Sequence, residues 1–120
     1  MNIESSNTYN DFETMVVAVE SGHRCGYVKI PKDHNLYELY YEDPQFESIT
    51  VHGGVTFTDR IEDDWFIGFD CIHGGDAVDL TLVKDSLKEF YTKHQLEGLV
   101  WTQPMVETEL EKLTEQLKEK

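Results

Sequence analysis

A chain of 120 residues with 39% hydrophobic and 12% aromatic residues is long enough to bury one hydrophobic core, which predicts a single domain over residues 1–120. Its 24 acidic and 10 basic residues give a formal net charge of −14, which argues against a protein that binds nucleic acid directly, because phosphate contacts need a basic surface. The sequence contains no run of about 18 apolar residues, which argues against a membrane span.

The N-terminal residues and the cysteines predict the cellular compartment. The first seven residues contain neither the basic nor the apolar stretch of a secretory signal. We therefore expect a cytoplasmic protein in which Cys25 and Cys71 are free thiols, although the sequence alone leaves a disulfide between them open.

The first half of the chain predicts a β-hairpin followed by a long loop. Residues 12–20 and 24–30 are rich in β-branched and apolar side chains, and the turn signal Ser21-Gly22-His23 separates them. Residues 31–47 carry two prolines and three tyrosines, which indicates an irregular excursion. Loops of this length in a compact domain are more often functional than idle.

Further strands are predicted in the middle of the chain. Residues 48–59 predict a third strand that Gly53 and Gly54 interrupt. Residues 65–73 predict a fourth strand, and its apolar density is typical of a central position with both faces covered. Residues 78–83 predict a short fifth strand.

The C-terminal third predicts two helices. Ser86 and Glu89 have the spacing of a capping box that opens a helix, and Gly98 is suited to end it. A second helix is expected to start near Pro104. Its apolar stripe consists of Val106, Leu110, Leu113 and Leu117. We assign this stripe to the core, with self-association into a homo-oligomer as the alternative. The predicted fold is α+β, an antiparallel sheet of four to five strands with C-terminal helices on one face.

Strand alternation predicts a polar cluster. If both segments are extended, His52 and Thr56 share one face of the third strand, and pairing can set them against Asp70 of the fourth. The Asp70 carboxylate would then fix the tautomer of the His52 ring. A half-buried histidine that only satisfies a carboxylate would give the same pattern.

The glycine pairs and the aromatic loop suggest a ligand site around this cluster. Paired glycines allow a close approach of the backbone, so their N–H groups could hold an anion, although no known nucleotide fingerprint is present. An arginine is suited to clamp a planar anion, and tyrosines can stack over a ring. The predicted ligand-binding residues are Arg24, Tyr37, Tyr41, His52, Gly53, Gly54, Thr56, Asp70, His73, Gly75 and Asp76. No residue is assigned as catalytic.

A metal-dependent hydrolase is the first alternative. It would use His52, His73 and Asp76 as ligands and Asp70 as general base. These residue types suit zinc, but their spacing matches no established zinc motif. The sequence therefore names no cofactor and leaves open whether the protein is an enzyme.

Several short segments resemble a family of small bacteriophage proteins without an assigned activity. The matching segments are GHRCGYV at residues 22–28, VHGGVTF at 51–57 and WFIGFDCIHGGD at 65–76. Their order and spacing also match those of the family. The stretch after Asp76 is longer than the family pattern. The resemblance implies a phage origin, and hence an accessory role such as inhibiting a host enzyme, mimicking DNA or sequestering a nucleotide signal of host defence.

These observations predict a phage-encoded accessory or counter-defence binding protein. It would sequester a small nucleotide-type ligand in a pocket around the HGG and GFDCIHGGD segments. Another alternative is an acidic inhibitor whose residues 38–64 imitate nucleic acid and occupy a basic host protein.

Overall fold

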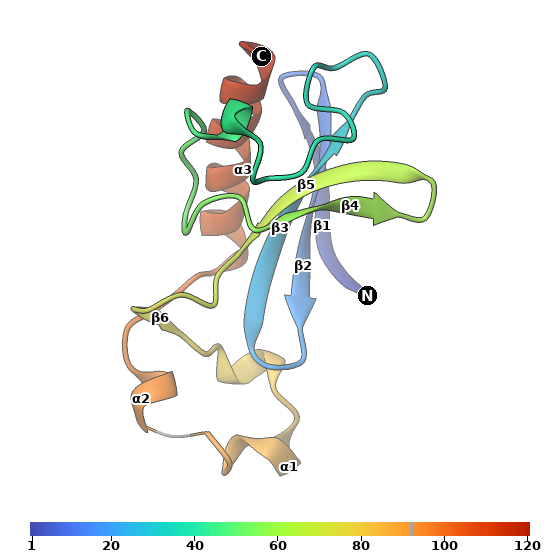
Figure 1. Cartoon of the computed structure of the whole chain (residues 1–120). Helices are drawn as coiled ribbons and strands as arrows, with labels where there is room; N and C mark the ends of the chain where they lie inside the picture. The colour runs from blue at the N-terminus through green and yellow to red at the C-terminus, as the bar shows by residue number, and fades with distance from the viewer. Residues whose placement is uncertain (92) are drawn as a thin grey trace.

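The computed structural model describes residues 1–91 and 93–120, and it contains a five-stranded antiparallel sheet in the order β1-β2-β3-β5-β4 (Figure 1). The strands are β1 (Asn2–Tyr9), β2 (Phe12–Val19), β3 (His23–Ile30), β4 (Phe57–Ile61) and β5 (Asp64–Asp70). The α3 helix (Gln103–Lys118) covers one face of this sheet. The α+β prediction, with a sheet of four to five strands under a C-terminal helix, is confirmed.

The predicted hairpin is present as β2 and β3, whose register pairs Thr14 with Val28. The predicted fourth strand is β5, and it is central as expected because it pairs with both β3 and β4. It ends at Asp70, three residues earlier than predicted.

The edge strand β1 is not among the strands predicted from the sequence, because its residues are mostly polar. It pairs antiparallel with β2 through a two-residue turn at Asn10 and Asp11. Both turn residues have positive φ, 51° and 68°, as a type I′ hairpin turn requires, and Asn and Asp tolerate that region better than most residues. The Asn-Asp pair before a strand is the signal that could have revealed this hairpin.

The stripe of α3 belongs to the core. Val106, Leu110, Leu113 and Leu117 are all 0% exposed and pack with Val28, Ile67 and Phe69 of the sheet. Each buried leucine stabilises the fold by roughly 1.5–3 kcal/mol through apolar burial. The stripe is therefore not available for self-association in this fold.

The predicted third strand at 48–59 is wrong, because only its end is extended, in β4. Gly53 and Gly54 have φ of +70° and +80°, which turns the chain instead of continuing a strand. The loop before β4 contains the short 3-10 helix η1 (Pro44–Phe46) and is anchored by apolar side chains. Those buried in the core are Leu36, Phe46, Ile49 and Val51.

The region after β5 also differs from prediction. In place of a strand at 78–83 the chain forms the 3-10 helix η2 (Leu80–Leu82). In place of one helix from Ser86 to Gly98 there are two single turns, α1 (Asp85–Lys88) and α2 (Lys93–Leu96), and residue 92 lies outside the described residues. The strands β6 (Asp76–Ala77) and β7 (Leu99–Val100) pair in parallel. These elements gather beyond the end of the β2–β3 hairpin (Figure 1).

Candidate functional site

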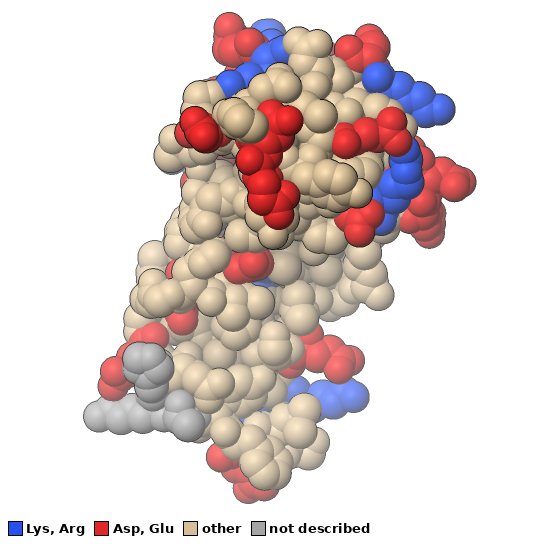
Figure 2. Space-filling view, in the orientation of Figure 1, with Lys and Arg blue, Asp and Glu red and all other residues tan. Residues whose placement is uncertain are grey.

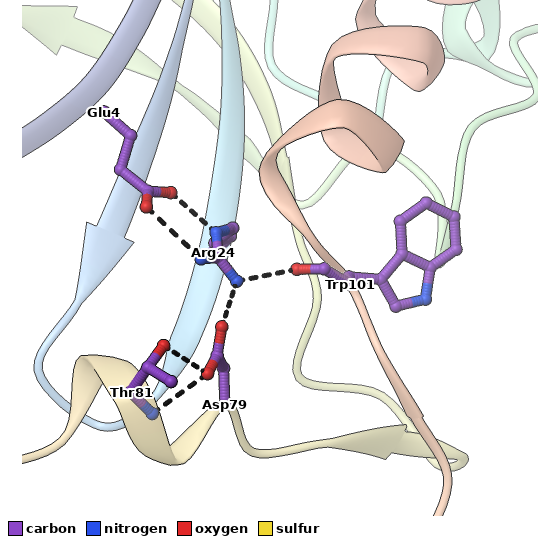
Figure 3. A network of polar contacts seen from close by, with 5 residues as sticks. All are labelled: Glu4, Arg24, Asp79, Thr81 and Trp101. Carbon is purple, nitrogen blue, oxygen red and sulfur yellow. Dashed lines mark hydrogen bonds and ion pairs between the residues drawn. The ribbon is translucent and has the colours of Figure 1, made fainter.

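Arg24 joins four separate segments of the chain (Figure 3). Its guanidinium donates to both carboxylate oxygens of Glu4 in β1, with Nε–Oε1 at 2.6 Å and Nη2–Oε2 at 3.2 Å. Nη1 donates to Asp79 Oδ2 at 2.8 Å and to the carbonyl of Trp101 at 3.0 Å. The residue is only 7% exposed. The prediction that Arg24 lies at a pocket rim as an anion clamp is therefore wrong. Arg24 joins β1 and β3 to Asp79 and to the segment that leads into α3.

Asp79 is the N-cap of η2 and is fixed from the other side by Thr81, the middle residue of that helix. Its Oδ1 accepts hydrogen bonds from the Thr81 backbone N–H at 3.0 Å and the Thr81 hydroxyl at 2.6 Å. Burial alone would raise the pKa of Asp79, but the hydrogen bonds from Thr81 and Arg24 outweigh it and lower that pKa below its usual value. Asp79 therefore faces Arg24 as a carboxylate.

The predicted polar cluster forms, with different pairs. The Nε2 atom of His52 lies 2.8 and 2.9 Å from the two carboxylate oxygens of Asp76. Asp70 instead accepts the Thr56 hydroxyl at 3.0 Å and lies 3.1 Å from His73 Nε2. The prediction that Asp70 orients His52 is wrong, because His52 sits in a turn where strand alternation does not apply.

His52 is held by residues far away in the sequence. Its ring stacks on Trp101 with centroids 4.0 Å apart and planes at 25°, and its backbone N–H donates to Glu109 Oε1 at 2.7 Å. The His73 ring is nearly perpendicular to it, with the two ring centroids 5.6 Å apart. Asp76, whose side chain is 4% exposed, also accepts the His73 backbone N–H at 3.0 Å. The orientation of His52 is therefore set by Asp76 and Trp101 together.

His73 lies against the backbone of the HGG turn. Its Nε2 is within ion-pair distance of Asp70 but makes no hydrogen bond there. A Cβ on Gly53 would stand 2.0 Å from this nitrogen, so only glycine allows the two segments to approach so closely.

A matched pair of substitutions tests this contact. Gly53→Ala and Gly54→Ala both place a side chain at positive φ, at a cost of about 1–2 kcal/mol each. Only the first collides with His73, since nothing lies within 4 Å of a Cβ on Gly54. We expect Gly53→Ala to lower the free energy of unfolding by about 1–3 kcal/mol more than Gly54→Ala. Urea denaturation measures the difference; equal losses would contradict the contact.

A cavity of about 430 Å³ opens beside His73 and Asp76. Its lining comes from the β5–β6 connection, the start of β3 and the α2–β7 region. The lining residues are His23, Ile72, His73, Gly74, Gly75, Asp76, Val78, Gln95, Glu97 and Gly98. A Cβ on Gly74 or Gly75 would meet nothing within 4 Å. Burial lowers the pKa of His23 despite the nearby Asp76 and Asp70, which favours the neutral form of its ring.

The two predicted tyrosines occupy different places. Tyr37 packs against Trp65 with ring centroids 6.4 Å apart. Trp65 and Asp70 are five residues apart along β5, or about 17 Å at the rise of a strand, so the prediction that Tyr37 covers the polar cluster is wrong. The backbone N–H of Tyr41 donates to Thr58 at 3.1 Å, two residues along the chain from Thr56, and the role of the Tyr41 ring stays a prediction.

The chemistry of the cluster does not fit a metal centre. Within residues 1–91 and 93–120, as far as they are described, no group of three or more His, Cys, Asp or Glu side chains is arranged to hold a metal ion. His52 and Asp76 are paired with each other, while His73 turns toward Asp70. The described residues therefore do not favour the hydrolase alternative.

The cysteines are free and buried. Burial raises the pKa of both thiols, that of Cys71 to about 12. A thiol in this state supplies little thiolate at neutral pH, so neither cysteine is suited to nucleophilic attack.

No helix in the described parts of the chain combines the length and apolar character needed to cross a membrane. No protein-family model, no curated protein and no solved structure matches this chain.

Proposed function

We propose that the chain is a binding protein that captures a small nucleotide-type ligand by its nucleoside part, in the cavity beside His73 and Asp76. The size and the lining of the cavity are the observations that support this proposal. Its volume of about 430 Å³ falls in the usual range of small-molecule sites, about 300–1,000 Å³. Its lining includes the imidazole rings of His23 and His73, whose nitrogens can donate or accept the hydrogen bonds that a base and a ribose need.

The charge of the lining argues for the nucleoside over the phosphate. Asp76 and Glu97 line the cavity and Asp70 lies beside it, while none of the described lining residues is Lys or Arg. Arg24, the expected anion clamp, is fully engaged by Glu4, Asp79 and the Trp101 carbonyl. A phosphate here would face like charges, which cost about 1–4 kcal/mol at 4 Å in a wet site.

The biological setting of the proposal comes from the resemblance to small phage proteins. A protein that binds such a ligand without converting it is suited to sequester a signal molecule. We accordingly propose an accessory or counter-defence role, acting by stoichiometric capture.

Titration calorimetry with adenosine, guanosine, cytidine and uridine, and with their 5′-monophosphates, tests the ligand class. We expect at least one nucleoside to bind, and its monophosphate to bind about tenfold more weakly, which corresponds to about 1.4 kcal/mol. Failure of all eight compounds to bind would overturn the proposal, and tighter binding of the monophosphates would overturn the choice of the nucleoside part.

A blocking variant locates the site. Gly74 has space around its Cβ position, so Gly74→Leu is expected to fill part of the cavity and to weaken nucleoside binding by at least about tenfold. Gly74→Ala, a small change at the same position, is the control and should bind within about threefold of the wild type. Equal binding by the two variants would place the ligand elsewhere.

A further inference from the structure

At the other end of β5, two aromatic rings flank one arginine, and a third ring packs against one of the two. Tyr37 and Tyr40 come from the loop before β4, and Trp65 comes from the start of β5. The ring centroid of Trp65 lies 6.4 Å from that of Tyr37 and 6.0 Å from that of Tyr40. The guanidinium carbon of Arg60, the cross-strand neighbour of Trp65, lies 5.6 Å from the centroids of both Tyr37 and Trp65. We call Tyr37, Tyr40 and Trp65 the three-ring cluster.

The contacts of Arg60 in this cluster are those of a cation held by a recognition site. The faces of two rings attract the guanidinium, the Tyr37 hydroxyl accepts from Nη1 at 3.2 Å, and the Glu38 carboxylate pairs with Nη2. Glu38 itself has a positive φ of 62°. The side chain of Arg60 remains 39% exposed, so it can leave without opening the core.

One polar group of this cluster lacks a partner. The Trp65 indole Nε1 is buried and has no hydrogen-bond acceptor among the described residues, although a buried indole N–H normally has one. It belongs to one of the two rings beside which the Arg60 guanidinium lies. A ligand that replaces Arg60 would therefore contact the ring that carries this donor.

We propose that the three-ring cluster, with Glu38, binds an arginine side chain of a partner protein, and that Arg60 fills this site in the free chain. The incoming guanidinium takes over the same ring faces and the same carboxylate, so the exchange preserves the interactions that Arg60 makes. The formal net charge of −14 attracts a basic partner. Acidic side chains form several separate groups on the face shown in Figure 2, which is more suited to local pairing with single basic side chains than to imitation of a continuous phosphate backbone. This site is independent of the cavity beside His73.

Removal of Arg60 gives the direct test. The probe is Nα-acetyl-argininamide, and the readout is the indole N–H peak of Trp65 in a two-dimensional NMR spectrum, identified by its loss in Trp65→Phe. We expect Arg60→Ala to bind the probe with a Kd on the order of millimolar, at least about tenfold tighter than the wild type. The neutral citrulline analogue of the probe should bind Arg60→Ala at least about tenfold more weakly than the arginine compound.

The controls separate this site from general charge effects. Lys29→Ala makes the same change in net charge at a residue that pairs with Glu13 and Asp64 instead. It should bind the probe no better than the wild type. Adding Tyr40→Ala to the Arg60→Ala variant should weaken binding by about threefold or more. Arg60→Gln serves as a second variant if Arg60→Ala loses its dispersed spectrum.

Three outcomes would overturn the proposal. The first is the lack of any shift of the Trp65 peak in both Arg60 variants. The second is equal affinity of Lys29→Ala and the Arg60 variants, and the third is equal affinity for the arginine and citrulline compounds.

Discussion

Replacing Arg24 with methionine is expected to lower the free energy of unfolding by about 3–5 kcal/mol, the usual cost of breaking a buried ion pair by removing one partner. Arg24 is 7% exposed, and methionine keeps much of its length while removing every donor. Glu4 and Asp79, with side chains 18% and 16% exposed, would lose their cation, and the Trp101 carbonyl would lose its donor. Urea denaturation at pH 7 measures the loss.

The other arginine of the chain provides the matched control. Arg60→Met removes the same group from a partly exposed ion pair, which is worth about 0–1 kcal/mol. Similar losses for the two variants would show that Arg24 is not the cross-link between β1, β3 and the segment that leads into α3.

The Arg24 effect should also depend on pH. Because the pKa of Asp79 is lowered in the folded protein, its ionised form stabilises the fold above the unfolded pKa of about 3.9. That contribution is lost as the pH falls through the lowered folded value. We therefore expect the stability difference between wild type and Arg24→Met to be constant above pH of about 5 and to shrink below pH of about 4. A difference that grows on acidification would contradict the pairing.

Leu110→Ala is expected to lower the free energy of unfolding by about 3–5 kcal/mol, near the upper end for buried leucines. Leu110 is 0% exposed, and its Cδ2 lies 3.1 Å from the position of a Cβ on Gly26. Because glycine has no side chain with which to fill the space, the surroundings can collapse only partly into the cavity. Denaturation in urea, with the slope compared between variants, gives the value.

Two further variants bracket the Leu110 prediction. Leu110→Met keeps the volume and should cost less than about 1.5 kcal/mol. Leu87→Ala truncates a leucine that is 42% exposed and should cost less than about 1 kcal/mol. A loss for Leu110→Ala no larger than that for Leu87→Ala would contradict the placement of α3 on the sheet.

The sequence could predict those elements whose apolar residues follow a regular local pattern. The β2–β3 hairpin shows a turn between two apolar runs, and α3 shows apolar residues at helical spacing, so both were predictable. The strand β1 was not, because its partly exposed edge position permits a polar sequence. The third strand was misplaced because the signs of φ at Gly53 and Gly54 cannot be told from residue type.

The candidate site shows the same division. The sequence predicted which residues gather, because histidines and carboxylates beside glycine turns are uncommon in apolar segments. It could not predict the pairs, because the partners of His52 lie far from it in the sequence. Asp76 follows β5, and Trp101 and Glu109 are about 50 residues or more away. Trp101 was missed for this reason. Arg24 and Tyr37 were assigned to the wrong sites because nothing local distinguishes a buried cross-link from an exposed ligand contact.

The position of α3 has a consequence for synthesis of the protein. The sheet is made from residues 2–70, and loop side chains within that range contribute to its core, but the apolar side chains of α3 arrive only with residues 106–117. During translation the face formed by Val28, Ile67 and Phe69 therefore lacks its helix while more than thirty further residues are added. We expect nascent chains stalled before Val106 to be captured by chaperones or degraded, and chains that include Leu117 to escape both.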